Sequence, residues 1–162
     1  MDSKLIQLID QSLHRLTHCN LPAPNNIQDR ICWIKHQAPY ALLAHDKDAE
    51  PKFIFANDTA LHTFGYNEVE FIGMPSKNSA SQEHRVARSL KLAGAASEKI
   101  IFGYQGVRVS KSGVSFPIYG GIIWNIQYHD GRPLGQAAIF WPEDCKRPEW
   151  YNCLLSLEQD HP

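Results

Sequence analysis

Residues 57–73 read NDTALHTFGYNEVEFIG, and this is the most informative pattern in the chain. Asn57 can cap a helix as the chain leaves a strand, because its side chain accepts hydrogen bonds from the first main-chain N–H groups of the helix. Leu61 and Phe64 follow at helical spacing, and Phe64 is expected to face a sheet. Gly65 permits a sharp reversal, since glycine adopts backbone angles that other residues avoid. A second short helical turn completes the stretch.

The chain before this stretch is predicted to form two helices and two strands. An amphipathic helix occupies residues 3–18, and a shorter helix occupies residues 27–36. The spacing of the apolar residues then changes from helical to that of a strand. Residues 40–45 and 53–56 are predicted to form two short strands, and the charged residues 46–51 between them a turn. We therefore expect a hairpin directly before the first helical stretch described above.

The chain after this stretch is predicted to form one helix and three long strands. Residues 81–96 are predicted to form a helix with a basic stripe, which is expected to be a solvated face, with phosphate binding as the less favoured alternative. Residues 100–110, 114–127 and 134–141 are rich in β-branched and aromatic side chains, and hairpin turn sequences join them. Helices gathered between the second and third strands predict an α+β fold, in which five antiparallel strands carry helices on one face. The tail from Pro142 shows only one or two possible helical turns.

Several separated motifs resemble those of one known fold family. The asparagine that opens the first helix and the Phe-Gly-Tyr at 64–66 that closes it are similar to the signature of PAS domains. The segments MPSKNSA (74–80), YQGVRVSKSG (104–113) and GQAAIF (135–140) are similar to hallmark segments of a narrower group, the MEKHLA domain in its separate bacterial form. The resemblance covers residues 27–141 and implies a PAS-like fold with a sensory, ligand-binding or protein-interaction role in signalling.

The resemblance divides the chain into three parts. Residues 1–26 hold the N-terminal helix and a linker, residues 27–141 the PAS-like MEKHLA domain, and residues 142–162 a C-terminal tail. The apolar stripe of the N-terminal helix is costly to leave in water, so we expect this helix to pack on a partner subunit or on the outer face of the sheet. PAS domains hold haem, flavin, a small metabolite or nothing, so the resemblance leaves the ligand open.

A candidate ligand-binding site follows from the strand pattern. Strict alternation along residues 114–127 places Phe116 and Trp124 on one apolar face, beneath the helices. If Gly113 takes the left-handed position of a bulged turn, Arg108 lies opposite Phe116 and joins that face. The predicted site combines one cation with aromatic, apolar and amide side chains: Asn57, Leu61, Phe64, Tyr104, Arg108, Phe116 and Trp124.

Two interpretations of Arg108 are open at this point. Its guanidinium offers a bidentate fork to an anionic or carbonyl-bearing ligand. Alternatively it pairs with a carboxylate, Glu70 or Glu83, and ties the sheet to a helix, because an arginine is almost never fully buried without a partner. The first interpretation predicts a binding site and the second a structural strut.

The sequence argues against two well-known PAS cofactors, and the cofactor is left as unknown. The photochemistry of flavin-binding LOV domains needs an Asn-Cys-Arg-Phe segment just after Gly73, and this chain has no cysteine there. Haem-binding PAS domains use a histidine on the long helix. His84 stands near the start of that helix, but a single histidine on a polar helix is more often a surface residue.

The chain carries no recognisable catalytic motif. It has no nucleophile elbow, phosphate loop or metalloprotease sequence. Asp58 is the carboxylate nearest the predicted cavity mouth, and it is expected to stabilise a helix N-terminus instead. We therefore expect binding, not catalysis. A ligand-free dimerisation scaffold is the main alternative, and a haem sensor and a small enzyme are less favoured.

Composition and charge limit the partners. The chain of 162 residues carries 16 Lys and Arg against 17 Asp and Glu, which gives no overall field toward nucleic acid or an anionic membrane. Its apolar runs are shorter than the about 20 residues of a membrane span, and no signal-peptide pattern begins the chain. We expect a cytoplasmic protein whose partners are a small molecule and a second copy of the chain or a regulatory protein.

Four cysteines are scattered along the chain, at Cys19, Cys32, Cys145 and Cys153. They form no Cys-x-x-Cys pair, so neither a zinc ribbon nor a redox motif is predicted, and in a reducing compartment all four are expected to be free thiols. Cys32 and His36 stand four residues apart and could share a helix face. Without a second pair of ligands they do not predict a metal site.

Overall fold

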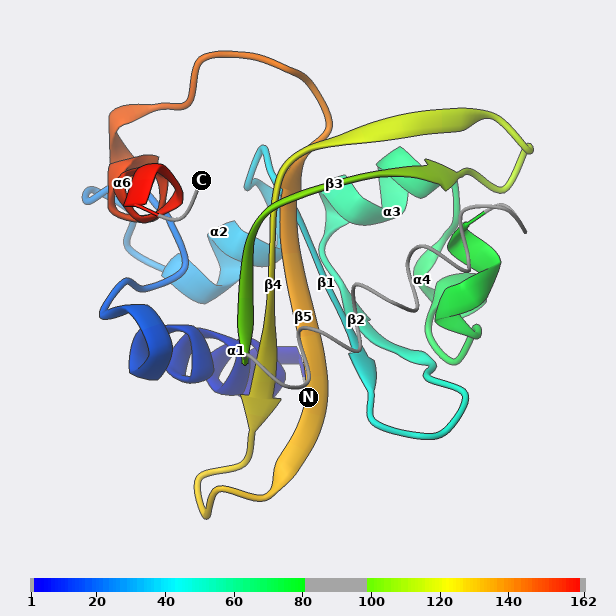
Figure 1. Ribbon diagram of the computed structural model, residues 1–162, viewed down its shortest axis with the longest axis horizontal. Coiled ribbons are helices and arrows are strands. Elements are labelled where there is room, and N and C mark those ends of the chain that lie inside the picture. The colour runs from blue at the N-terminus through cyan, green and yellow to red at the C-terminus, as the bar shows by residue number, and fades with distance from the viewer. Residues whose placement is uncertain (1, 81–98, 161–162) are drawn as a thin grey trace.

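The computed structural model describes residues 2–80 and 99–160, and its centre is one antiparallel sheet of five strands (Figure 1). The strands lie in the order β2-β1-β5-β4-β3. Their bounds are β1 Ala41–Asp46, β2 Phe53–Ala56, β3 Ile100–Val109, β4 Ser115–Gln127 and β5 Pro133–Trp141. The predicted α+β fold is confirmed. The predicted helix at 81–96, with its basic stripe and His84, lies outside the described residues.

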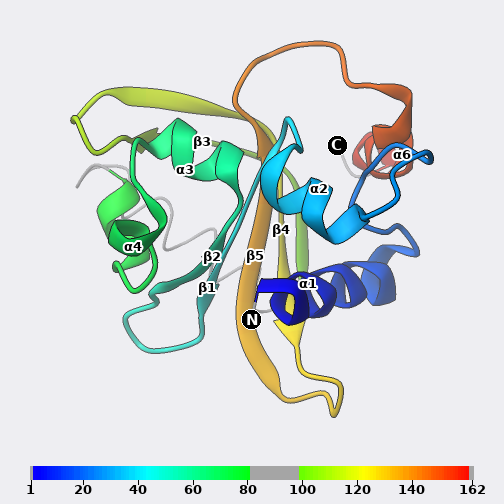
Figure 2. The ribbon, with the colours of Figure 1, turned by 180° about the vertical axis from the view of Figure 1, so that it is seen from behind.

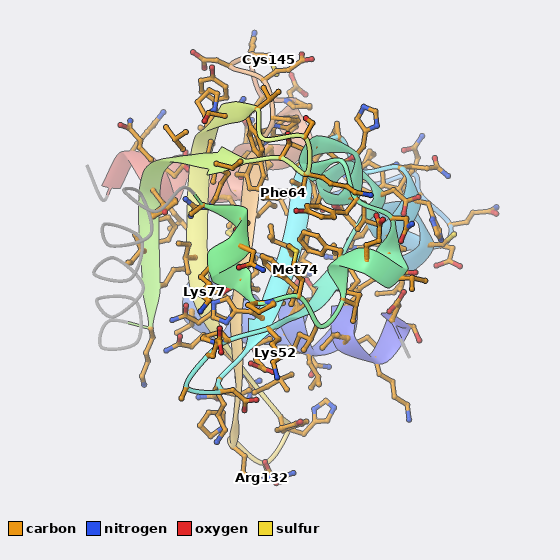
Figure 3. The ribbon with its side chains drawn as sticks, turned by 90° about the vertical axis from the view of Figure 1, so that its right-hand side faces the viewer. Lys52, Phe64, Met74, Lys77, Arg132 and Cys145 are labelled. Atoms are coloured by element: carbon orange, nitrogen blue, oxygen red, sulfur yellow. A yellow bond between two sulfur atoms is a disulfide. The ribbon has the colours of Figure 1, made fainter. Side chains whose placement is uncertain are left out.

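Two short helices and a 3-10 turn cover one face of the sheet, called the inner face below. They are α3 (Asp58–Phe64), α4 (Glu68–Phe71) and η1 (Ser76–Ser79). Figure 3 looks toward this side of the molecule, with Phe64 and Met74 near its middle. As predicted, α3 ends at Gly65, which takes the left-handed conformation with φ of 78° and donates its N–H to the carbonyls of the last turn.

The other face of the sheet, called the outer face, is also covered, and by segments from both ends of the chain. They are α1 (Asp2–Thr17), α2 (Arg30–His36), η2 (Glu149–Tyr151) and α6 (Asn152–Asp160). Figure 1 and Figure 2 show these helices on the opposite side of the sheet from α3 and α4. Ile6, Ile9 and Leu13 of α1 are fully buried in the same apolar cluster as the sheet. The N-terminal helix thus takes the outer-face alternative of the two that its apolar stripe predicted.

Lys35 connects the helices of the two faces. Its side chain is almost fully buried, and its ammonium donates to the main-chain oxygen of Ala56 and to the carboxylate of Glu68, both at 2.6 Å. The carboxylate of Asp2 lies 3.6 Å from the same nitrogen. Because Asp2 begins α1 and Glu68 begins α4, one buried charge ties both layers to the edge of the sheet.

A bulge in β4 changes which side chains share a face. The predicted cross-strand pairs, Arg108 with Phe116 and Trp124 with Ala137, are both confirmed. The register shifts, however, between Tyr119 and Ile122, at a glycine with φ of 58°. Such a bulge inserts a residue and reverses the alternation beyond it. Phe116 therefore faces α3 on the inner face, whereas Trp124 faces α1, and the prediction that the two share a face is wrong.

The expectation of four free thiols is also wrong. Cys19 and Cys153 form a disulfide, with their Cα atoms 5.9 Å apart and a sequence separation of 134. Cys32 and Cys145 are free and exposed. The sequence offered no sign of the pairing because the two cysteines meet only when both ends of the chain pack on the outer face.

Two further features of the described residues bear on the sequence predictions. Within residues 2–80 and 99–160, no three side chains among His, Cys, Asp and Glu gather as a metal site would require. His36 instead places its Nδ1 atom 2.9 Å from the carboxylate of Asp58, at the start of α3. In the same part of the chain, every helix is too short or too polar to cross a membrane.

Candidate ligand-binding site

A small cavity lies within the inner-face core, among strands β1, β3, β4 and β5. Its volume is about 40 Å³. A cavity needs about 10–15 Å³ to hold one water, so this one has room for a few waters or for a ligand of similar size. Most of its lining is apolar, and the lining includes Phe64, Tyr104, Arg108, Gly121 and Ile123 together with the polar residues His45 and Ser79.

Among the described residues that line this cavity, Arg108 carries the charged guanidinium, and it is 6% exposed. Its Nη2 atom donates to the hydroxyl of Tyr104, and its Cζ atom lies 5.2 Å from the centre of the Tyr104 ring. The Nη1 atom donates to the main-chain oxygen of Val107 at 3.2 Å. Tyr104 therefore orients the guanidinium both by a hydrogen bond and by its π face.

No ion pair joins Arg108 to a carboxylate within residues 2–80 and 99–160. Glu70, one of the two predicted partners, pairs instead with Lys111 at 2.6 Å. The hydrogen bond from Lys111 holds the pKa of Glu70 below its usual range. Glu83, the other predicted partner, lies outside the described residues.

Asn57 is fully engaged in the fold. Its Oδ1 accepts from the main-chain N–H groups of Leu42 and Ala60, each at 3.0 Å. Its Nδ2 donates to the carbonyls of Ile34 and Tyr40, at 3.1 and 3.0 Å. An amide side chain has two donor hydrogens and one oxygen with two lone pairs, so no capacity is left for a ligand. Asn57 is a helix cap that also joins α2 and β1, and the prediction that it binds ligand is not supported by this geometry.

The structure brings the other predicted inner-face residues together. Phe64 lines the cavity, and its ring meets that of Phe116 edge to face, with centroids 5.2 Å apart. Leu61 is half-buried at the edge of the same apolar cluster. Trp124 is fully buried against α1 on the other face. Of the seven predicted site residues, three line the cavity: Phe64, Tyr104 and Arg108. Leu61 and Phe116 pack against the same apolar cluster without lining the cavity, Asn57 is used by the fold, and Trp124 lies behind the sheet.

The cavity lining also includes Ile123 and Gly121, which the sequence analysis did not predict, although the sequence contains a sign of the bulge that places them there. Ile123 faces the cavity because the bulge in β4 reverses the alternation that was applied to this strand. Gly121 also lines it, and a Cβ atom there would lie 2.8 Å from the main-chain oxygen of Tyr104. Two consecutive glycines inside a strand are a mark of a bulge or of a close backbone approach, and both occur here.

The comparisons with known proteins agree with this architecture. The model of the MEKHLA domain family matches residues 3–142. The chain belongs to the MEKHLA domain family. The match begins within α1, so the part of this MEKHLA domain that resembles the family includes the N-terminal helix. No curated protein matches the sequence.

Solved structures similar to this MEKHLA domain include PAS and LOV domains. A PAS domain of a protein from Colwellia psychrerythraea has a TM-score of 0.61 at 16% identity, over 70% of this chain and 93% of that one. The LOV domain of a blue-light activated histidine kinase from Erythrobacter litoralis has a TM-score of 0.54 at 14% identity, over 64% of this chain and 95% of that one. At such identities the likeness shows the PAS fold alone.

The LOV likeness raises the question of a flavin, and the cavity of this MEKHLA domain does not fit one. Pockets for drug-sized ligands have volumes of about 300–1,000 Å³, far above the 40 Å³ found here. The described residues that line it include no cysteine, and the segment after Gly73 forms η1. A ligand of this cavity must be much smaller than a fused tricyclic ring system.

Proposed function

We propose that this MEKHLA domain is a sensory module in signalling or regulation, which binds a small carboxylate or carbonyl compound in the inner-face cavity. The observation that carries the proposal is the buried guanidinium of Arg108, which Tyr104 orients and which no carboxylate of the described residues neutralises. A buried charge without a counter-ion is costly, and an anionic ligand removes that cost. The interaction is strengthened by the apolar surroundings, because the local dielectric constant is low.

The contacts within the cavity suggest a separate role for each of its residues in binding the ligand. Arg108 is the ligand-contacting group, because its fork matches the two oxygens of a carboxylate. Tyr104 is a positioning residue that acts through Arg108. Phe64 and Ile123 supply apolar surface for a short hydrocarbon part. The small volume restricts the ligand to a few non-hydrogen atoms unless the helices move.

Binding is favoured over catalysis by the arrangement of the other polar lining groups. His45 is the cavity residue best suited to act as a base, and its Nδ1 lies 2.7 Å from the main-chain oxygen of Asp46. The hydroxyl of Ser79 donates to the main-chain oxygen of Ser76 at 2.7 Å. Ser79 thus donates to a main-chain oxygen, whereas an activated serine nucleophile donates to a neighbouring base.

The proposal includes the location of the domain and the kind of partner it has. The near balance of 16 basic and 17 acidic residues favours a protein or small-molecule partner over nucleic acid or an anionic membrane. We place the domain in the cytosol, where it reports its ligand state to a regulatory protein or to a second copy of itself. A ligand-free dimerisation scaffold is the competing function, and the experiment below separates the two.

The test combines native mass spectrometry with a titration of the purified full chain. Acetate is the probe, and acetamide is the matched control because it has the same shape without the charge. We expect acetate to raise the midpoint of thermal unfolding, and acetamide to have a much smaller effect. A mass corresponding to a small bound acid in the native spectrum would support the sensor. Equal and negligible responses to both compounds, in a dimeric protein without a bound mass, would favour the scaffold.

A further inference from the structure

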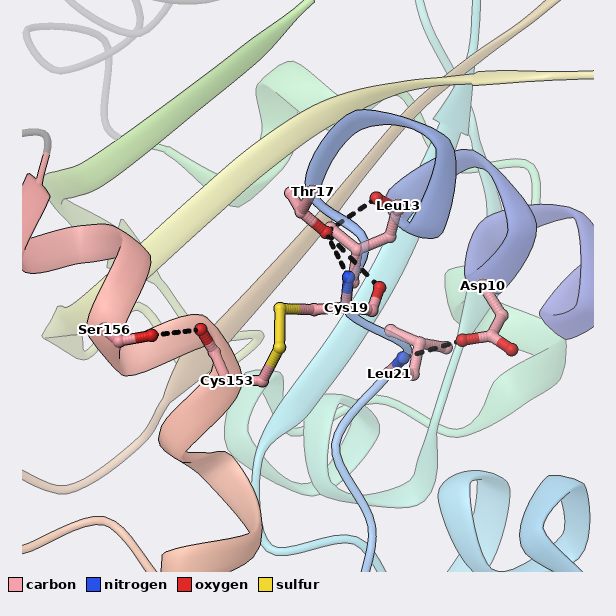
Figure 4. The surroundings of a disulfide bond; sticks show 7 residues. All are labelled: Asp10, Leu13, Thr17, Cys19, Leu21, Cys153 and Ser156. Atoms are coloured by element: carbon pink, nitrogen blue, oxygen red, sulfur yellow. Dashed lines mark hydrogen bonds between the residues drawn. A yellow bond between two sulfur atoms is a disulfide. The ribbon is translucent and has the colours of Figure 1, made fainter.

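The disulfide joins the two ends of the chain on the outer face of the sheet (Figure 4). Cys19 follows the end of α1 and is 3% exposed. Cys153 is in the first turn of α6 and is exposed. The bond is thus buried on the side of the N-terminal helix and open to solvent on the side of the C-terminal helix, where a reductant has access.

The C-terminal segment, residues 142–160, packs on the outer face mainly through aromatic and apolar side chains. Tyr151 and Leu154 are almost fully buried. The ring of Trp150 meets that of Trp33 in α2, with centroids 5.3 Å apart, and the ring of Tyr151 lies 5.2 Å from that of Trp141. The segment therefore covers an aromatic surface formed by α2 and the end of β5.

Apart from this apolar packing and the guanidinium of Arg147, which lies 4.8 Å from the centre of the Trp141 ring, the described contacts give the segment little support. Helix α6 has nine residues, fewer than the 12–15 or so that an isolated helix needs in water. Arg147 donates to the main-chain oxygens of Glu143 and Cys145, so these hydrogen bonds stay within the segment. The Oε1 atom of Glu158 is buried and, among the described residues, has no hydrogen-bond partner. Such a group costs free energy when the segment docks.

The N-terminal side of the disulfide is held by other contacts. The Oγ1 atom of Thr17 donates to the carbonyl of Leu13 at 2.8 Å and accepts from the main-chain N–H of Cys19 at 3.0 Å (Figure 4). The main-chain N–H of Leu21 donates to Asp10 at 2.6 Å, and Asp10 also pairs with Arg30. Cys19 therefore stays in place whether or not the bond to Cys153 exists.

We propose that the Cys19–Cys153 disulfide is a redox latch, and that its reduction releases residues 142–160 from the outer face while the sheet and α1 stay folded. The reductant is a dithiol. One of its thiolates attacks the disulfide and forms a mixed disulfide, one cysteine leaves as a thiolate, and the second thiol of the reductant completes the exchange. Two electrons and two protons pass to Cys19 and Cys153, and the reductant becomes a disulfide.

The latch would give the domain a second input, independent of the inner-face cavity. In the cytosol, disulfides are usually transient and catalytic or redox-sensing, so the proposed location agrees with a bond that opens and closes. Release of the segment uncovers Trp33 and Trp141, which changes the surface available to a partner. The C-terminal segment packs on the outer face of the sheet, whereas the ligand cavity lies in the core of the inner face.

The experiment is hydrogen exchange of the full chain, oxidised and after treatment with dithiothreitol, with mass spectrometry to confirm the state of the cysteines. We expect the amides of residues 149–160 to exchange about ten-fold faster or more after reduction, while those of β4 and α1 change little. The double substitution Cys19→Ser and Cys153→Ser should exchange like the reduced protein in both conditions. The matched double substitution Cys32→Ser and Cys145→Ser should keep the full response to dithiothreitol.

Three outcomes would overturn the latch. Equal exchange of the C-terminal segment in both states would show that packing alone holds it. A rise throughout β4 and α1 would show a staple of the whole fold instead of a local latch. Free Cys19 and Cys153 in protein exposed to air would show that the bond does not form. The acetate titration addresses the ligand proposal separately, because it can be carried out on the Cys19→Ser and Cys153→Ser protein.

Discussion

Trp124 in β4 donates its indole N–H to the main-chain oxygen of Ile9 in α1, at a distance of 3.3 Å. The contact joins residues 115 positions apart and lies in a fully buried interface. It makes the N-terminal helix a layer of the protein's own core, and it takes Trp124 out of the ligand site. The outer face of the sheet is therefore covered within the chain, so a dimer through that face would require α1 to leave.

Placing a charge in this interface should detach α1. We expect Ile9→Asp to lower the stability of the domain by several kcal/mol, because it buries an unpaired carboxylate against an apolar surface. The protein should also become less soluble, as it should when residues 1–20 are deleted. Urea unfolding and light scattering measure the two effects. Gln11→Asp, on the exposed side of the same helix, is the control and should behave like the unaltered protein.

The role of Arg108 can be separated from stability with one substitution. Arg108→Met keeps the aliphatic stem and removes the fork, so a charge-assisted hydrogen bond of about 1.5–3 kcal/mol is lost. We expect the affinity for acetate to fall by roughly 10- to 150-fold, with little change in the thermal midpoint. Tyr104→Phe, which keeps the ring and removes the hydroxyl, should cause a smaller loss of affinity.

Two results would speak against this role. A drop in stability of several kcal/mol, with acetate binding affected only through unfolding, would indicate that Arg108 pairs with a buried carboxylate. An unchanged affinity in a stable Arg108→Met protein would remove Arg108 from the site. A thermal melt and a titration on the same variant distinguish these cases.

The two helix caps Asn57 and Asn67 should differ in their contribution to stability. Asn57→Ala leaves several buried main-chain groups of α2, β1 and α3 without partners, so we expect a loss of at least about 2 kcal/mol in urea unfolding. Asn67 caps α4 at an exposed site, and Asn67→Ala should cost only about 1 kcal/mol. Equal losses of unfolding free energy in the two variants would mean that the hydrogen bonds of Asn57 to α2 and β1 add nothing to its contribution as a helix cap.

The carboxyl of Glu158 should make stability depend on pH. Burial raises its pKa above the ordinary value of 4.5, and Arg147 opposes the shift. The folded protein thus binds this proton more tightly than the unfolded chain does. The contribution of Glu158 to stability is therefore fully present at a pH below the pKa of the unfolded chain, and it is lost as the pH rises through the raised pKa of the folded protein. Glu158→Gln should therefore raise the thermal midpoint at neutral pH and give no advantage near about pH 4.

The control for this prediction is Glu149→Gln, which changes an exposed residue at the start of η2. Its thermal midpoint should follow that of the unaltered protein at every pH. If Glu158→Gln also follows the unaltered protein, the carboxylate of Glu158 is solvated and α6 docks without the penalty inferred from its burial.

The amino-acid sequence alone determined most of the elements and the pairing of strands that follow one another along the chain, whereas the pairing of β1 with β5 emerged only in the structure. These features depend on local rules: Asn57 and Gly65 mark the ends of α3, and hairpin turns set the register that places Arg108 opposite Phe116. Together with the family motifs, they were sufficient to predict a PAS-like fold and three residues that line the cavity, Phe64, Tyr104 and Arg108.

Only the tertiary structure decided which face each side chain takes beyond the bulge of β4 and which cysteines meet. One inserted residue near Gly120 reverses the alternation, so Trp124 faces α1 although its partner Ala137 was predicted correctly. Cys19 and Cys153 are 134 residues apart, and no local pattern links them. They come together because α1 and α6 both bury apolar side chains on the outer face, and burial of that kind is a property of the whole packed chain.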